Sequence, residues 1–198
     1  ALNGQVINRT SDSLLVKDFQ VLKEEILKLP YVEAASTAET YPGAGYENLS
    51  SFMGITKPDG TLDEQTVYYQ YQAQPDYFKV MGIQLLAGEV FRSNPNGYGN
   101  DVVVNEKFAK DMGVPNASEA VGKQLKFFGQ NWKIVGVMKN YHHFGLKTAM
   151  EPLLIRPGSA SRNLVVKLDK SALSSTGLTS ALEALKNKWK SVFPQSTY

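Results

Sequence analysis

Two stretches near the ends of the chain carry the same apolar spacing, and this repeat constrains the fold most. Within residues 13–29, five apolar residues recur at steps of four, three, four and three, which places them on one face of a helix: Leu15, Phe19, Leu22, Ile26 and Leu29. The same steps separate five residues near the C-terminus: Leu178, Leu182, Leu185, Trp189 and Val192. Pro30 ends the first helix, and Pro194 ends the second.

Strand-like stretches accompany both helices. Residues 31–40 follow the first helix and close at the turn Tyr41-Pro42-Gly43, whereas residues 163–168 precede the second helix. Residues 4–8 are the candidate for a matching strand before the first helix. Two strand-helix-strand units at opposite ends of the chain predict an α+β fold, in which a split repeat forms a mixed sheet with helices on one face. The alternative is that two unrelated amphipathic helices share one spacing.

The middle of the chain, residues 46–156, has the pattern of a β-rich insertion. Residues 67–73 alternate like a strand with one buried face, and the three valines at 102–104 predict a short buried strand. Residues 123–128 and 132–138 flank Gly129-Gln130-Asn131, a pattern typical of a β-hairpin.

Two short helices are expected inside this insertion. The first, at residues 76–81, has Asp76 as its N-terminal cap and Gly82 at its end. The second, at residues 106–112, has Asn105 as its cap and Gly113 at its end. Residues 93–100 predict a surface loop.

Composition excludes several classes of function. The chain of 198 residues has a net charge of +2 and no run of five like charges, which argues against a nucleic-acid-binding tail or a membrane-docking patch. It has no cysteine, so disulfides, zinc–thiolate sites and thiol catalysis are excluded together. It has neither roughly 18 continuous apolar residues nor a signal-peptide pattern. From the two ends of the sequence, we expect a piece of a longer protein that continues in both directions.

The candidate reactive groups do not form a catalytic constellation. Adjacent residues such as His142 and His143 usually point to opposite sides, so we expect one packed ring and one solvated ring, with no metal site. Residues 94–100 and the dipeptide Gly122-Lys123 lack the spacing of a phosphate-binding loop, so any ATP must be hydrolysed by another polypeptide. No serine occupies a Gly-x-Ser-x-Gly elbow. We therefore predict no enzyme activity and no cofactor.

Four ordered blocks in the middle of the chain resemble one protein family. Residues 75–91 (PDYFKVMGIQLLAGEVF) are similar to the "YF..MGI.LL.GR.F" signature of the MacB-like periplasmic core domain. Residues 103–109 with 120–123, then 134–142 (IVGVMKNYH), then 150–153 (MEPL) resemble the blocks that follow it. The matching positions, which we expect to be structural, are Tyr77, Phe78, Met81, Gly82, Ile83, Gly88, Phe91, Asn105, Glu106, Gly122, Gly136, His142 and Pro152. Two positions depart from the family, Glu89 for the common Arg and Asn140 for the frequent Asp, so no particular substrate is carried over.

This resemblance implies a permease subunit of an ABC transporter of the MacB/FtsX type. It implies a porter-like subdomain made of residues 1–44 and 158–198, and an inserted β-rich, sabre-like subdomain made of residues 45–157. The implied partners are flanking transmembrane helices of the same polypeptide, a separate cytoplasmic ATPase, a second permease in a dimer and a periplasmic or outer-membrane partner, but no nucleic acid. The implied place is the periplasmic face of the inner membrane, with this chain itself soluble.

These inferences predict one function and leave one alternative. The predicted function is mechanotransmission, in which a non-catalytic domain couples ATP-driven motion of membrane helices to export or to an envelope partner. The alternative is an extracytoplasmic solute- or peptide-binding sensor, whose pocket would be lined by the aromatic cluster Tyr68, Tyr69, Tyr71, Tyr77 and Phe78. For these five residues we favour cross-strand core packing over a cleft.

Overall fold

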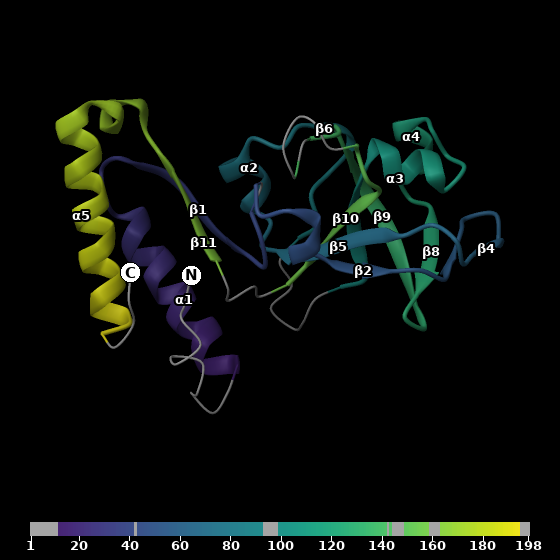
Figure 1. The fold of residues 1–198 in the computed structure, drawn as a ribbon, viewed down its shortest axis with the longest axis horizontal. Helices are drawn as coiled ribbons and strands as arrows, with labels where there is room; N and C mark the ends of the chain where they lie inside the picture. The colour runs from purple at the N-terminus through teal and green to yellow at the C-terminus, as the bar shows by residue number, and fades with distance from the viewer. Residues whose placement is uncertain are drawn as a thin grey trace.

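A computed structural model describes residues 12–41, 43–92, 99–141, 143, 149–158 and 163–194. In this part of the chain, one mixed sheet of eleven strands runs from end to end of the molecule, with α-helices packed on it (Figure 1). The strand order is β11-β1-β5-β10-β7-β9-β8-β3-β4, with β2 paired to β5 and β6 paired to β9. The predicted α+β class is confirmed. The candidate strand at residues 4–8 and most of the predicted loop at 93–100 lie outside the described residues.

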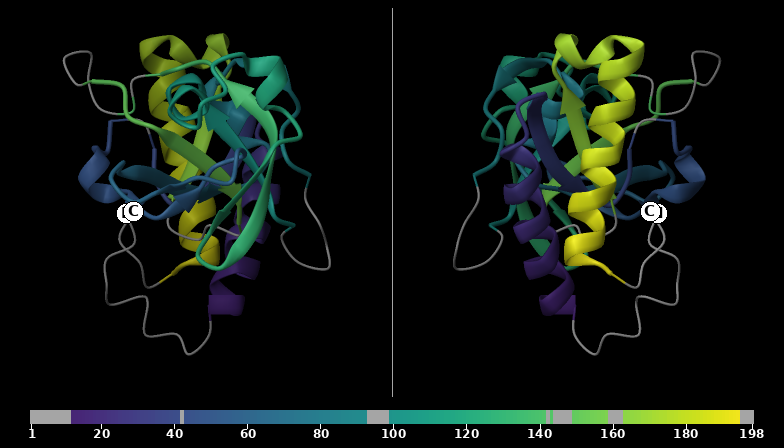
Figure 2. Two further views of the ribbon diagram at one scale, coloured as in Figure 1. Left: turned by 90° about the vertical axis from the view of Figure 1, so that its right-hand side faces the viewer. Right: turned by 90° about the vertical axis from the view of Figure 1, so that its left-hand side faces the viewer.

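The elements from the two ends of the chain form one layer. Helices α1 (Asp12–Leu27) and α5 (Ser175–Val192) lie side by side and pack on the antiparallel strands β1 (Val32–Ala38) and β11 (Asn163–Leu168), as Figure 2 shows. The short 3-10 helix η2 (Lys170–Leu173) joins β11 to α5. We call these five elements the terminal layer.

The core of the terminal layer comes from the apolar face of α1. Its Phe19, Leu22 and Ile26 are buried against Leu185 and Phe193. The ring of Trp189 meets that of Phe19 edge-on, with 6.1 Å between the ring centroids. Each such buried side chain contributes about 1.5–3 kcal/mol to folding. The stripe predicted for the first helix is therefore confirmed at these positions.

The stripe predicted for the second helix is wrong over its first turns. Leu178 and Leu182 are 39% and 46% exposed, while Ala181 is fully buried. The buried line of α5 runs through Ala181 and Leu185 toward Phe193, at steps of four and eight, so the first two leucines fall beside it. A small alanine is buried there instead of the leucines, which apolar spacing alone does not indicate.

The chain between β1 and β11 forms the inserted elements, which fill the other end of the molecule. The first are η1 (Tyr46–Asn48), β2 (Ser50–Phe52), β3 (Ile55–Thr56), β4 (Leu62–Asp63) and β5 (Tyr68–Ala73). Next come α2 (Tyr77–Met81), β6 (Leu85–Gly88), β7 (Asp101–Asn105), α3 (Glu106–Asp111) and α4 (Ala117–Ala120). The last are β8 (Gln124–Phe127), β9 (Gln130–Met138) and β10 (Leu153–Pro157).

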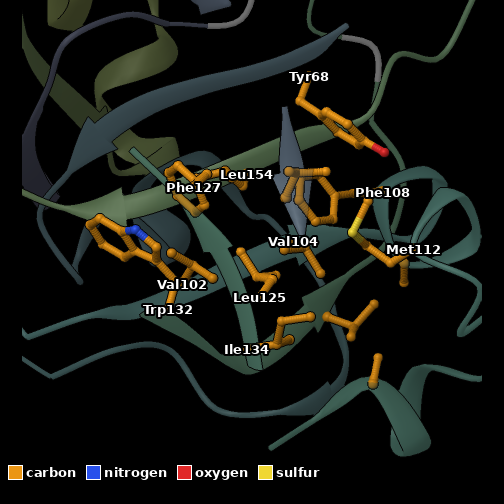
Figure 3. Close-up of a cluster of buried hydrophobic side chains, with 14 of the residues drawn as sticks. Tyr68, Val102, Val104, Phe108, Met112, Leu125, Phe127, Trp132, Ile134 and Leu154 are labelled. Atoms are coloured by element: carbon orange, nitrogen blue, oxygen red, sulfur yellow. The ribbon is translucent and has the colours of Figure 1, made fainter. Parts of the chain in front are cut away.

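The inserted elements have their own core under the central strands. Figure 3 shows Val102 and Val104 of β7 among side chains from α3, β8, β9 and β10. The valines at 102–104 are fully buried, as predicted. Strand β5 differs from its prediction because four of its six residues are buried rather than every second one. It lies inside the sheet, beside β10 on one edge and beside β1 and β2 on the other.

Two local predictions of turns and caps need correction. The β8–β9 hairpin forms, but its turn is Phe128-Gly129, with Phe127 paired to Gln130. Both turn residues have positive φ, 50° and 73°, as a two-residue hairpin turn of the I′ type requires. Asn105 caps α3 as predicted, because its side chain accepts a hydrogen bond from the N–H of Phe108. Asp76 makes no capping hydrogen bond to α2, since its carboxylate binds elsewhere.

Candidate functional site

The place where the terminal layer meets the inserted elements is a narrow junction in the sheet. Strand β1 reaches β5 through one residue pair, Ala38 opposite Ala73. Two backbone hydrogen bonds flank this pair, from the N–H of Glu39 to the carbonyl of Gln72 (2.9 Å) and from the N–H of Gln74 to the carbonyl of Thr37 (3.0 Å). The sheet is therefore continuous across the junction, but by only one ladder step.

Side chains add to this backbone link. The carboxylate of Glu39 accepts a hydrogen bond from the N–H of Gln72 at 2.8 Å. Asn163, at the start of β11, donates its side-chain amide to the carbonyl of Glu39 at 2.8 Å. Residues from β1, β5 and β11 are thus joined within a few ångströms, and we call this set, with Ala38 and Ala73, the junction.

A buried lysine of α1 forms a second connection beside the junction. The ammonium of Lys23 donates to the carboxylate of Asp76 at 2.7 Å and to the side-chain oxygen of Gln74 at 3.0 Å. Lys23 is 8% exposed, so its charge requires such partners. Asp76 has helical backbone angles, not the extended conformation of a cap, and its carboxylate points to α1. This tertiary contact explains why the predicted cap is absent.

Helix α2, which follows Asp76, carries the first motif residues into the core. Tyr77 is fully buried, with its hydroxyl 3.5 Å from the carbonyl of Thr40, and burial raises its pKa to about 12. Phe78 packs edge-on against Phe91, with ring centroids 5.6 Å apart. The motif positions Met81 and Ile83 join the same cluster as partly buried residues. The motif thus anchors α2 next to the junction.

A chain of buried hydroxyl and imidazole groups lies behind α2. The hydroxyls of Tyr71 and Tyr141 are 2.7 Å apart, and that of Tyr141 is 3.4 Å from Nδ1 of His143. His143 is fully buried, and burial lowers its pKa to about 4. Burial also raises the pKa of Tyr71 and Tyr141 well above the ordinary value, so all three groups are neutral at pH 7. The expected packed ring of the histidine pair is that of His143, whereas His142 lies outside the described residues.

The motif residues Asn105 and Glu106 connect three other elements. The side-chain oxygen of Asn105 accepts from the N–H of Phe108 (2.9 Å) and of Leu153 (3.0 Å), while its amide donates to the carbonyl of Glu151 (2.8 Å). The carboxylate of Glu106 accepts from the N–H of Asn140 at 2.8 Å. These bonds hold α3, β10 and the end of β9 together.

The remaining motif residues have structural places. Pro152 is buried, and its carbonyl accepts from the N–H of Tyr69 at 2.9 Å. Gly136 of β9 faces the carbonyl of Glu89 so closely that a β-carbon would collide with it, and a β-carbon on Gly88 would collide with the carbonyl of Val135. Gly82 ends α2, and the N–H of Gly122 donates to the carbonyl of Ile134.

Four of the five residues in the aromatic cluster proposed for a cleft lie in the core. Tyr68, Tyr71, Tyr77 and Phe78 are at most 4% exposed, so they are not free to line an open pocket, and Tyr69 is partly buried against the same core. A cavity of about 330 Å³ lies instead beside the end of α2, lined by Met81, Gly82, Ile83, Gln84, Lys139, Asn140 and Tyr141. Across the described ranges, no three His, Asp or Glu side chains gather in a way that would hold a metal ion.

Lys23 is the site residue that sequence reasoning missed. It lies four residues after Phe19 and three before Ile26, so a charged side chain falls on the apolar face of the predicted helix. A lysine at such a position needs a polar partner from another part of the chain. A charged residue on an apolar helix face therefore predicts such a contact, although it does not identify the partner.

Comparison with known proteins agrees with this arrangement. The model of the MacB-like periplasmic core domain family matches residues 3–181. The chain belongs to this family. It is thus a MacB-like periplasmic core domain. No curated protein matches the chain. None of the helices in the described ranges has the length and apolar character needed to cross a membrane.

Solved structures show the same fold at low sequence identity. The periplasmic region of MacB from Actinobacillus actinomycetemcomitans has 19% identity and a TM-score of 0.54, over 85% of this chain and 72% of that one. The extracellular domain of the noncanonic ABC-type transporter YknZ from Gram-positive bacteria has 16% identity and a TM-score of 0.55, over 86% and 81%. A domain of a putative permease from Porphyromonas gingivalis has 18% identity and a TM-score of 0.54, over 84% and 68%.

Proposed function

We propose that this MacB-like periplasmic core domain transmits motion from membrane helices to its distal, inserted elements and has no catalytic role. The observation that carries this proposal is the arrangement of α1 and α5. The first and last described helices lie side by side and pack on the two strands that continue, through the junction, into the rest of the sheet (Figure 1). A displacement of either helix therefore moves the edge of a sheet that reaches the far end of the molecule.

The two helices are also tied to each other. Glu25 of α1 accepts from the ammonium of Lys188 of α5 at 2.7 Å, and it also pairs with Lys28. These bonds hold the pKa of Glu25 at about 2. The pair of helices is thus suited to move as one unit.

The proposal includes a division of the chain and a set of partners. Residues 1–44 and 158–198 form a porter-like subdomain, and residues 45–157 form a sabre-like one. The proposal places the domain on the periplasmic face of the inner membrane, between transmembrane helices of the same polypeptide. A separate ATPase drives the motion, a second permease completes a dimer, and a periplasmic or outer-membrane partner receives the movement. The core under α1 and the core around β7 share no residue, which supports this division, while a third cluster joins Ala38 and Val165 to α2 and β5 at the boundary.

An insertion experiment tests the coupling. A flexible glycine–serine segment placed after Pro30, between α1 and β1, should abolish export by the permease while ATP hydrolysis by the assembled transporter continues. The same segment placed in the exposed turn at Asp59-Gly60 is the matched control and should leave export intact. Undiminished export with the segment after Pro30 would contradict the proposal.

The cavity beside α2 favours a second candidate, the solute- or peptide-binding sensor. Its lining combines the apolar Met81 and Ile83 with the ammonium-bearing Lys139 and the amide of Asn140. A ligand that binds there should raise the unfolding temperature of the domain by mass action. A screen of small anions and short peptides without any such rise would count against the sensor.

A further inference from the structure

We propose that Lys23, Asp76 and Gln74 form the coupling contact through which a movement of α1 reaches α2, a proposal that rests on the proposed function. The contact joins the middle of α1 to the two residues that bracket Pro75, directly before α2. It acts beside the apolar packing of α2 on β1 and β11, and it bypasses the junction and β5. Movement of α1 then reaches α2 both through this polar contact and through the packed strands.

The contact is distinctive among the ion pairs of the described residues. The Lys188–Glu25 and Lys167–Glu33 pairs connect elements inside the terminal layer. Four further pairs join residues close together in sequence: Lys28–Glu25, Lys57–Asp63, Arg92–Glu89 and Lys107–Asp111. Lys23–Asp76 is the pair in this set that joins the terminal layer to the inserted elements.

The two partners differ in how far water reaches them. The side chain of Lys23 is 10% exposed, whereas that of Asp76 is 61% exposed. An apolar side chain at position 23 would pack on the core without this requirement for polar partners, and replacing such pairs by apolar residues is often neutral or stabilising. The lysine at this position therefore fixes how α1 is placed against the start of α2 more than it adds to the free energy of unfolding. Although water can solvate Asp76 when the pair opens, the buried ammonium of Lys23 would lose its carboxylate, so the closed arrangement of the contact is favoured.

The contact ends on a segment that is firmly anchored. Asp76 is followed by Tyr77 and Phe78, which are buried against Tyr71 and Phe91. A pull on Asp76 is therefore transmitted to the core of the inserted elements instead of being lost in a loose loop. Lys23, Asp76 and Gln74 are positioning residues in this sense, since none of them contacts a transported substrate in the proposal.

Distance measurements between spin labels test the contact in this cysteine-free chain. Labels at Lys17→Cys on α1 and Lys126→Cys on β8 report the placement of α1 relative to the inserted elements, because both side chains are exposed. Asp76→Asn should widen this distance distribution and shift its mean. Labels at Lys17→Cys and Asn187→Cys, both inside the terminal layer, should keep their wild-type distribution in the same variant. Lys167→Met, which removes an ion pair inside that layer, should change neither distribution.

The outcomes separate this inference from the proposed function. An unchanged distribution between α1 and β8 in Asp76→Asn overturns the coupling contact, whatever happens to export. A shifted distribution with unchanged export by the full permease supports the contact and overturns mechanotransmission as its use. If Asp76→Asn lowers the unfolding temperature so far that the domain does not fold, Asp76→Glu, which keeps the charge, should restore both folding and the wild-type distribution. Failure of Asp76→Glu to restore them would also overturn the inference.

Discussion

Replacing Asn105 by alanine should destabilise the domain far more than an ordinary loss of a helix cap. The side chain is 2% exposed and makes three hydrogen bonds to backbone groups of Phe108, Leu153 and Glu151. Loss of a cap costs about 1 kcal/mol. Each of the other two backbone groups, left buried without its partner, adds about 1–3 kcal/mol. The total for Asn105→Ala is therefore about 3–7 kcal/mol.

The chain offers a matched control for this prediction. Asn116 caps α4 in the same way, accepting from the N–H of Ser118 at 3.0 Å, but its side chain is exposed. Asn116→Ala should cost only about 0.5–1 kcal/mol. Urea unfolding followed by circular dichroism gives both values, and an unchanged slope with denaturant shows that only stability has altered. If the two substitutions cost the same within about 0.5 kcal/mol, the reasoning about the buried network is wrong.

Three further predictions concern the core and the junction. Because burial lowers the pKa of His143 to about 4, the unfolded chain binds more protons than the folded one between that value and 6.5. Stability should therefore fall by up to about 3 kcal/mol as the pH falls through this window, and His143→Phe should flatten that part of the curve of unfolding free energy against pH. The double variant Ala38→Cys, Ala73→Cys should form a disulfide on air oxidation, because the flanking hydrogen bonds make this a close antiparallel pair. The disulfide should raise the free energy of unfolding by about 2–4 kcal/mol relative to the reduced form. A thiol titration that finds both thiols free would refute this. Gly136→Ala should lower the unfolding temperature much more than Gly82→Ala. A β-carbon at position 136 collides with backbone, whereas one at position 82 meets open space and is disfavoured only by the φ of 65° at Gly82. Equal effects would contradict the close approach of Gly136 to the carbonyl of Glu89.

Part of the fold could be predicted because its causes are local. The face of α1 follows from spacing alone, since Phe19, Leu22 and Ile26 have a helical period that Lys23, on the same face, does not interrupt. The cap at Asn105 and the glycine after α2 follow from backbone chemistry. The family could be predicted from four ordered blocks in the middle of the chain.

The rest depended on contacts between distant parts of the chain. The first turns of α5 contain leucines at a helical spacing, but the way the helix packs on its neighbours buries Ala181 and leaves Leu178 exposed. Asp76 is a good local cap, yet the buried ammonium of Lys23 binds its carboxylate more favourably. The turn of the β8–β9 hairpin lies at Phe128-Gly129 and not at the predicted residues 129–131, because the pairing of the two strands sets the register. Such outcomes are decided by tertiary partners that a single sequence does not identify.

The pairing of β1 with β11 also has a consequence for the order in which the chain is made. During synthesis α1 and β1 are made early, whereas β11 and α5 are made much later. One edge of β1 and the apolar face of α1 therefore lack their partners for most of translation. The inserted elements have no such delay, since β5, β7, β8, β9 and β10 find strand partners among themselves. They are able to fold first and present a finished edge at β5, on which β1 docks before β11 arrives. A chain that ends before β11 would leave the edge of β1 that pairs with β11 exposed, and this edge could pair with other chains and start aggregation.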